Sequence, residues 1–212
     1  MPTPILYDFT AAPSPRRARI LLAEKGISVE NRQIDLTRAQ QLSPEYRAIN
    51  PACTVPALDL GDGTILTENQ GIAAWAEAVQ PEPPLLGRTP AEKGLVVGWN
   101  ARIEFEGLWP IADILRNTSR GMKDRALTGP DNVVQIPELA ERGRARLTRF
   151  FAMLNERLAG RDFIAIDAFS LADITALVAV DFAKWVKAEP APEHADLRRW
   201  HQAVAARPSA SA

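Results

Sequence analysis

The spacing of hydrophobic positions changes near residue 80. Before this point, short strand-like runs alternate with helical ones, which predicts strands at 5–9, 29–36, 57–60 and 64–66 and helices at 15–25, 44–49 and 68–79. Beyond residue 90 only helical spacing recurs, which predicts helices at 91–117, 137–159, 171–187 and 193–207. The pattern therefore indicates an α+β region followed by an all-helical region.

A proline-rich stretch separates the two regions. It runs from Pro81 to Pro90, and prolines at this density cannot lie inside a helix or a central strand. We therefore expect a first domain at 1–80, a linker at 81–90 and a second domain at 91–212. The order β-α-β-α-β-β-α predicts a thioredoxin-like fold for the first domain, and an all-α helical bundle is expected for the second.

A helix-capping pattern opens the predicted helix at 171–187. Ser170 can cap the helix, and Asp173 can accept a hydrogen bond from the Ser170 main chain. The residues that follow are apolar at helical spacing, which predicts the buried central helix of the second domain. They are Ile174, Leu177, Val178, Phe182 and Trp185.

Composition narrows the class of partner. The 212 residues are 46% hydrophobic, with 25 Lys and Arg against 26 Asp and Glu, so a net charge of −1 gives no overall attraction to nucleic acid or anionic membranes. One cysteine and two histidines, without zinc spacing, favour neither an internal disulfide nor a metal site. The start, Met1-Pro2-Thr3-Pro4, lacks a signal sequence, so we expect a cytoplasmic protein with a small-molecule partner and no membrane span.

The segment around Val55 and Pro56 is the strongest candidate for a binding site. It lies between a predicted helix and two predicted strands, and only proline makes a cis peptide bond accessible at low cost. A cis bond here would turn the N–H and carbonyl of Val55 outward. These groups could then pair with an extended peptide.

Several features in their order along the chain resemble the cytosolic glutathione transferases, of a bacterial type. They are the helix end at 22–26, Asn50-Pro51, Val55-Pro56, Glu68-Asn69, the proline linker and the Ser170–Asp173 pattern. The run Gln40-Gln41-Leu42-Ser43 is similar to the zeta-type members. The resemblance covers nearly the whole chain, and it implies glutathione as cosubstrate and a homodimer.

The resemblance also implies which residues bind glutathione. Val55, next to Pro56, would pair its main chain with the cysteinyl unit, and Glu68 with Asn69 would hold the γ-glutamyl end. Thr54 and Gln41 would reach the glycyl end. An acidic residue at a helix start is also ordinary matching of the helix dipole, so Glu68 has a purely structural alternative.

Catalysis requires a group that stabilises the glutathione thiolate, because a thiol with a pKa near 8.5 is mostly protonated at neutral pH. Many family members carry Ser or Cys where this chain has Ala12. Ser14, at the start of a predicted helix, is the leading candidate for the hydrogen bond to sulfur, although it could instead be a simple helix cap. Thr10 is the second candidate, and Tyr7 is the weakest because its ring is expected in the core.

Two arginines and the single cysteine near these residues have less specific interpretations. Arg17 and Arg19 could neutralise a carboxylate but are expected to be solvated charges. Cys53 has no CxxC partner and is expected to be a packed small side chain.

The second domain is expected to contact the electrophile. Arg102, Phe105 and Trp109 belong to an aromatic stretch that can form a pocket wall, and an aromatic stripe can equally be core. Trp109-Pro110 is expected to end or kink the helix.

The favoured function is transfer of glutathione to an electrophilic, largely apolar small molecule. The Gln40-Gln41 pair supports an alternative, glutathione-dependent isomerisation or dehalogenation of a small organic acid. Ala12 supports a third, a non-catalytic glutathione-binding or interaction module.

Overall fold

The computed structural model describes residues 3–212, which divide into two compact units. The first unit contains the chain up to Pro83, together with Thr128–Asp131 and Ala212, and the second contains Pro84–Leu127 and Asn132–Ser211. The division falls inside the linker expected from the sequence. Met1 and Pro2, part of the start in which no signal sequence is expected, lie outside the described residues.

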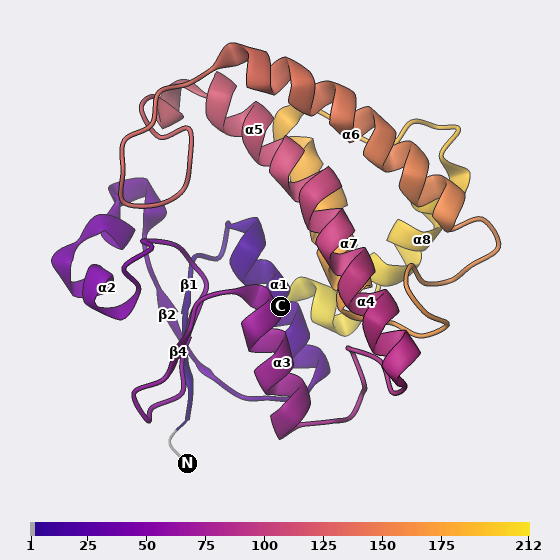
Figure 1. Ribbon diagram of the computed structural model, residues 1–212, viewed down its shortest axis with the longest axis horizontal. Helices are drawn as coiled ribbons and strands as arrows, with labels where there is room; N and C mark the ends of the chain where they lie inside the picture. Colours follow the sequence, from indigo (N-terminus) through magenta and orange to yellow (C-terminus); the bar gives the residue numbers. More distant parts are fainter. Residues whose placement is uncertain (1–2) are drawn as a thin grey trace. The chain divides into compact units, whose positions relative to one another are not determined.

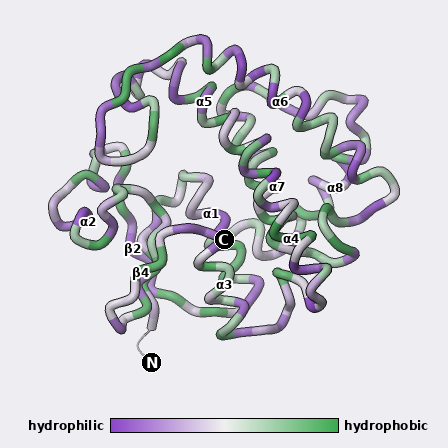
Figure 2. The backbone as a smooth tube through the Cα atoms, viewed as in Figure 1, coloured by the Kyte–Doolittle hydropathy of each residue, from purple (hydrophilic) through white to green (hydrophobic). Residues whose placement is uncertain are grey.

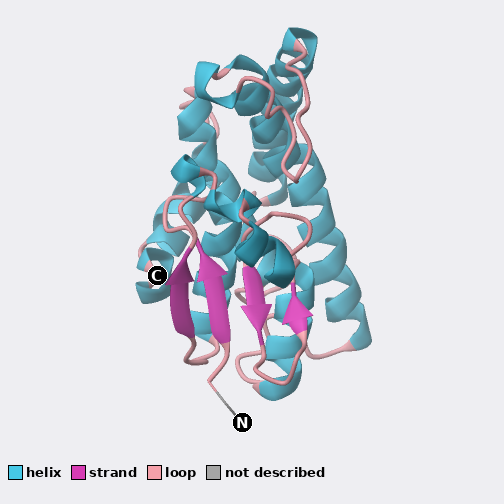
Figure 3. Ribbon diagram, turned by 90° about the vertical axis from the view of Figure 1, so that its left-hand side faces the viewer, coloured by secondary structure: helices cyan, strands magenta, loops and turns pink. Residues whose placement is uncertain are grey.

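The first unit is built on a four-stranded mixed sheet of order β2-β1-β3-β4 (Figure 3). The central strand β1 (Ile5–Asp8) pairs in parallel with β2 (Glu30–Gln33) and antiparallel with β3 (Ala57–Asp59), which pairs antiparallel with β4 (Ile65–Leu66). All four residues of the edge strand β2 are exposed. The alternation of apolar and polar residues at 29–36 predicted a strand with one buried face. The structure instead buries Ile34, the residue just after β2.

Three helices cover this sheet. Figure 1 shows α1 (Pro13–Glu24) and α3 (Asn69–Val79) on one side of the strands and α2 (Pro44–Ile49) on the other. Short 3-10 turns at Leu36–Arg38 and Gln40–Leu42 precede α2, which Ser43 caps by accepting from the Tyr46 N–H. The predicted thioredoxin-like fold is confirmed.

A buried lysine holds the end of this unit together. The side chain of Lys25 is fully buried, and its ammonium forms an ion pair with Glu77. It also donates to the carbonyls of Gln80, Pro81 and Pro83, at 2.9, 3.3 and 2.5 Å. These contacts tie the end of α1 to the end of α3 and to the proline stretch.

The second unit consists of helices. They are α4 (Pro90–Ile103), α5 (Trp109–Thr118), α6 (Pro137–Arg157), α7 (Leu171–Ala183) and α8 (Ala195–Ala205). A π-helical turn, Glu104–Leu108, joins α4 to α5, so the helix predicted at 91–117 forms but widens before Trp109. Gly107 in this turn touches Phe150 of α6 so closely that a Cβ there would lie 2.5 Å from the ring. The predicted all-helical C-terminal domain is confirmed.

Helix α7 is the core of the second unit. Every residue of α7 except Asp181 is buried, whereas α6 alternates hydrophobic and hydrophilic positions (Figure 2). The expectation for Trp185 is wrong: this residue lies in a 3-10 turn beyond the end of α7, Lys184–Val186, and is 52% exposed. The helical stripe ends where α7 ends.

The predicted capping pattern forms and does more than cap. Asp173 accepts from the main-chain N–H and hydroxyl of Ser170, at 3.0 and 2.9 Å. It also accepts from the Ile164 N–H at 3.0 Å and the Trp200 indole at 3.1 Å. Burial nevertheless raises the pKa of the Asp173 carboxyl to about 6.

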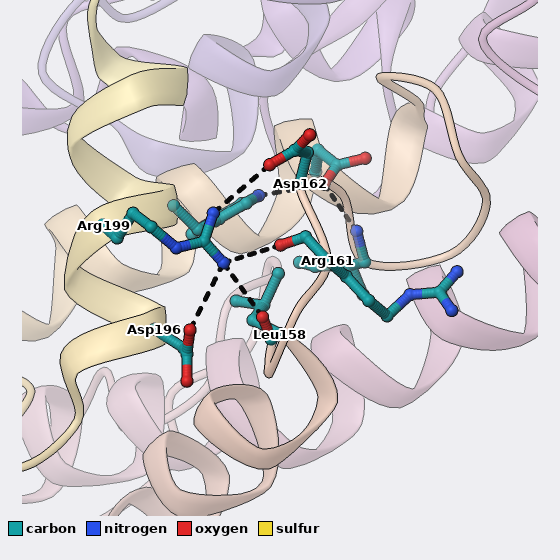
Figure 4. Close-up of polar contacts among 8 residues, drawn as sticks. Leu158, Arg161, Asp162, Asp196 and Arg199 are labelled. Carbon is teal, nitrogen blue, oxygen red and sulfur yellow. Dashed lines mark hydrogen bonds and ion pairs between the residues drawn. The ribbon is translucent and has the colours of Figure 1, made fainter.

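An arginine of α8 closes the turn that follows α6 (Figure 4). The guanidinium of Arg199 donates to the carbonyls of Leu158 and Arg161, at 3.0 and 2.7 Å, and pairs with Asp162 and Asp196. This turn leads to the loop before α7.

Among residues 3–212, no helix is long and apolar enough to span a membrane.

Candidate functional site

The peptide bond between Val55 and Pro56 is cis, as the sequence suggested. Val55 belongs to the core cluster of the first unit, with Tyr7, Ile34, Tyr46 and Ala57. No hydrogen bond joins the N–H or carbonyl of Val55 to another described residue. Both main-chain groups therefore remain available for a ligand.

Side chains fix the segment that leads to Val55. The carbonyl of Thr54 accepts from the Tyr46 hydroxyl at 2.6 Å and from the Asn50 amide at 2.8 Å. Burial raises the pKa of Tyr46 to about 12, so the hydroxyl remains a donor at neutral pH. Asn50 also donates to the Thr54 hydroxyl at 3.1 Å, which leaves the proton of that hydroxyl for another acceptor.

Cys53 lies in the same turn and is buried, with a positive φ of 53°. Its sulfur is 3.6 Å from the carbonyl of Pro51. This agrees with the expectation of a packed small side chain.

Ser14 occupies the second position of α1 and does not cap it. The residue at the N-cap is Ala12, so the interpretation of Ser14 as a simple cap is wrong. The Ser14 oxygen accepts from the Asn69 amide at 2.9 Å and from the Arg17 guanidinium at 3.3 Å. Because a hydroxyl oxygen has two lone pairs, its remaining capacity is to donate its proton.

The main chain at the start of α1 also leaves a donor next to this hydroxyl. Pro13 and Pro15 have no N–H, and the N–H of Ser14 has no acceptor among the described residues. The first helical turn carries partial positive charge from the helix dipole. Ser14 therefore combines an available hydroxyl proton and an available amide at one helix start.

Two amide oxygens of the predicted glutathione-binding set are buried without a partner among the described residues. They belong to Asn69, the first residue of α3, and to Gln41, in the 3-10 turn before α2. Buried polar atoms in folded proteins are nearly always hydrogen-bonded, so two orphaned acceptors need an explanation such as a ligand. Glu68 lies at the N-cap of α3 with an exposed side chain and makes no capping bond.

Thr10 has a different role from Ser14. Its hydroxyl and its N–H both donate to the Gln33 side-chain oxygen at 2.9 Å. Its carbonyl accepts from Arg19 at 3.0 Å. The proton that Thr10 would offer to a thiolate is thus already used within the protein.

The expectation that Arg17 and Arg19 are solvated is wrong. Only 8% of Arg17 is exposed, and the side chain of Arg19 is similarly buried. Arg19 forms an ion pair at 2.6 Å with Asp8, whose carboxylate also accepts from Gln33. A buried charge needs a partner, and the tertiary contact with Asp8 of β1 provides one for Arg19.

In the helical unit, Phe105 and Trp109 are 61% and 54% exposed. The guanidinium of Arg146 lies over the Phe105 ring at 4.4 Å. Arg102 instead borders a cavity of about 520 Å³ whose lining includes neither Phe105 nor Trp109. The lining residues are Trp99, Arg102, Met153, Glu156, Arg157, Ala159 and Arg161. The structure therefore does not bring the three predicted pocket residues into one described cavity of this unit.

Two features of the site have no clear signal in the sequence. The contact between Ser14 and Asn69 spans 55 positions, and no local pattern signals it. The segment Thr128–Asp131, which lies between the predicted helices at 91–117 and 137–159, groups with the first unit, where a Cβ on Gly129 would lie 3.9 Å from the Ala52 carbonyl. Among residues 3–212, no group of three or more His, Cys, Asp and Glu side chains could hold a metal ion.

Comparisons with known proteins show the family to which the two regions of the chain are similar. Residues 12–79 match the model of the glutathione S-transferase N-terminal domain, and residues 118–208 match that of the C-terminal domain. Glutathione S-transferase 2 of Saccharomyces cerevisiae is 36% identical over 208 residues, which are 97% of this chain and 87% of the yeast protein.

Two further matches are informative. The crystal structure of Gtt2 from Saccharomyces cerevisiae has a TM-score of 0.89 and 35% identity, with 97% of each chain covered. The maleylacetoacetate isomerase of Rattus norvegicus is 36% identical over 95 residues, 44% of each chain. With two domain matches that together cover most of its length, and a relative aligned along nearly all of it, the chain belongs to the glutathione S-transferase family of enzymes.

Proposed function

We propose that the protein binds glutathione in its first unit and transfers the glutathione sulfur to an electrophilic, largely apolar small molecule. The observation that carries this proposal is the contact between Ser14 and Asn69. It joins the starts of two helices and leaves a hydroxyl proton on Ser14 and an amide oxygen on Asn69 unused.

Each unused group has a matching part of glutathione. The main chain of Val55, next to Pro56, pairs with the cysteinyl unit in the manner of an added strand. Glu68 accepts from the γ-glutamyl ammonium, and the Asn69 oxygen accepts from the same end. Gln41 and the Thr54 hydroxyl serve the glycyl end.

Ser14 donates its proton to the thiolate. The thiol releases its proton to solvent, and the sulfur lone pair then forms a bond to the electrophilic carbon while the leaving group departs with its electron pair. Stabilising the anion lowers the thiol pKa and so raises the fraction of reactive thiolate at neutral pH. Thr10 is the alternative donor, and its bond to Gln33 makes it the weaker one.

We also propose the two other partners of the protein, the electrophile and a second copy of the chain. Phe105 and Trp109, whose side chains are largely exposed, form part of the wall that receives the electrophile, whereas Arg102 borders a separate cavity. The resemblance to the family also supports a homodimer in the cytoplasm.

The proposal is tested by calorimetric titration with glutathione, followed by an ultraviolet scan for bound thiolate. We expect binding together with a thiol pKa below that of free glutathione. Replacing Glu68 by alanine should raise the KM for glutathione about tenfold, because a charge-assisted hydrogen bond is lost. The control is Glu30→Ala, since Glu30 lies on the exposed edge strand. An unchanged KM in Glu68→Ala would remove that residue from the site.

A second candidate function is glutathione-dependent isomerisation or dehalogenation of a small organic acid. The similarity to the rat maleylacetoacetate isomerase and the Gln40-Gln41 pair favour it. Product analysis separates the two reactions. Transfer leaves a stable thioether, whereas isomerisation returns free glutathione with a rearranged substrate.

A further inference from the structure

Arg17 is a buried cation that the proposed reaction does not yet use. It lies one helical turn after Ser14 in α1, and its guanidinium donates to the Ser14 oxygen at 3.3 Å. Only 8% of Arg17 is exposed, so solvent screens its charge weakly at the Ser14 oxygen.

We infer that Arg17 is a positioning residue that sets the orientation and the donor strength of the Ser14 hydroxyl. The inference rests on the proposed function, because it concerns the hydrogen bond from Ser14 to the glutathione thiolate.

The geometry allows one role for the hydroxyl proton. Arg17 and the Asn69 amide donate to the same oxygen, at 3.3 and 2.9 Å, and together they use both of its lone pairs. The O–H bond can then rotate only among positions that avoid both donors. The Ser14 hydroxyl is thus oriented to donate before glutathione binds, so it does not need to reorient when the thiolate arrives.

The charge of Arg17 adds to this effect. A hydroxyl that accepts a hydrogen bond from a cation becomes a stronger donor, because hydrogen bonds in a chain polarise one another. The neutral amide of Asn69 cannot supply the charged part of this effect. Removing Arg17 should therefore raise the pKa of the bound thiol even though Asn69 still contacts Ser14.

The test is the thiol pKa of bound glutathione, read from thiolate absorbance as the pH is varied, in the wild type and in Arg17→Met. We expect the variant to raise this pKa by about one unit and to lower kcat/KM with an aryl halide about tenfold at pH 6.5. The two kcat/KM values should converge once the pH exceeds the thiol pKa in both proteins. The charge control is Arg38→Met, because the Arg38 side chain is 87% exposed and contacts Asp35.

Two further variants separate positioning from a merely structural role. Arg17→Lys keeps the charge and one donor, so it should restore at least part of the shift. If Arg17→Met does not fold, Arg17→Gln replaces it, because glutamine keeps a donor without the charge. In a Ser14→Ala background, Arg17→Met should change the thiol pKa by less than about 0.3 unit, because the residue acts through Ser14. Equal shifts in both backgrounds would overturn the inference.

The outcomes for the inference and for the proposed function are distinct. If the wild type binds glutathione with a lowered thiol pKa and Arg17→Met, or Arg17→Gln in its place, matches it at every pH, the inference fails and the proposed function stands. If the wild type binds no glutathione, the proposed function fails and the inference fails with it.

Discussion

At the scale of single residues, the hydroxyls of Ser14 and Thr10 differ in what they have left to offer. Ser14 accepts two hydrogen bonds, so its proton is available, whereas Thr10 donates its proton to Gln33. Residue type alone made both plausible donors to a thiolate. The neighbours of each hydroxyl separate them.

This difference predicts unequal effects of removing each hydroxyl. Ser14→Ala should lower kcat/KM at neutral pH about 10- to 100-fold, the value of a hydrogen bond to a charged atom, with little change in the KM for glutathione. Thr10→Val should lower it by less than about threefold. Steady-state kinetics with an aryl halide measure both. A larger loss in the threonine variant would transfer the catalytic role to Thr10.

At the scale of elements, the widened turn between α4 and α5 depends on a glycine. Gly107 lies against the Phe150 ring of α6, and its hydrogen atom occupies the place where a Cβ would be 2.5 Å from a ring carbon. A rigid ring that is 1% exposed cannot move aside cheaply. Gly98, earlier in α4, has nothing within 4 Å of the same position.

Two glycine-to-alanine replacements in one helical stretch should therefore act in opposite directions. Gly107→Ala should lower the free energy of unfolding by about 1–3 kcal/mol through overpacking. Gly98→Ala should raise it by about 0.5–1 kcal/mol, because alanine favours the helix interior. Urea denaturation measures both. Stabilisation by Gly107→Ala would show that the close approach to Phe150 is absent in solution.

At the scale of the whole molecule, the buried carboxyl of Asp173 couples stability to pH. Its pKa is raised to about 6 in the folded state because burial outweighs four hydrogen bonds, and in the unfolded chain it returns to about 3.9. Between these values the folded state binds more protons than the unfolded state. The contribution of Asp173 to stability is therefore largest below about pH 4, falls as the pH rises to about 6, and is constant above.

Comparison with Asp173→Asn isolates this effect. The difference in unfolding free energy between wild type and variant should change across pH 4 to 6 by about 1.4 kcal/mol per unit of pKa shift, in the direction of a relatively less stable wild type at higher pH. Half-buried carboxylates with lowered pKa values, such as Asp35 and Glu92, act in the opposite direction but are common to both proteins. A difference that does not vary with pH would show that Asp173 titrates normally.

The sequence by itself determined the features that arise from near neighbours in the chain. The change of hydrophobic period, the prolines after residue 80 and the Ser170–Asp173 capping pattern are local signals, and each element that they predict is present. Proline makes a cis bond at Val55-Pro56 accessible, because it removes most of the preference for trans, and the folded structure selects that isomer.

Only the tertiary structure decided which partner each polar side chain takes. The contact of Ser14 with Asn69, the burial of Arg19 against Asp8 and the bond from Thr10 to Gln33 join segments that no pattern relates. Their hydrogen bonds form only when folding brings distant segments together. Each of these polar side chains could pair equally well with many other donors or acceptors, so residue type does not identify the partner. The elements therefore follow from local preference, and the chemistry of the site follows from packing between distant segments.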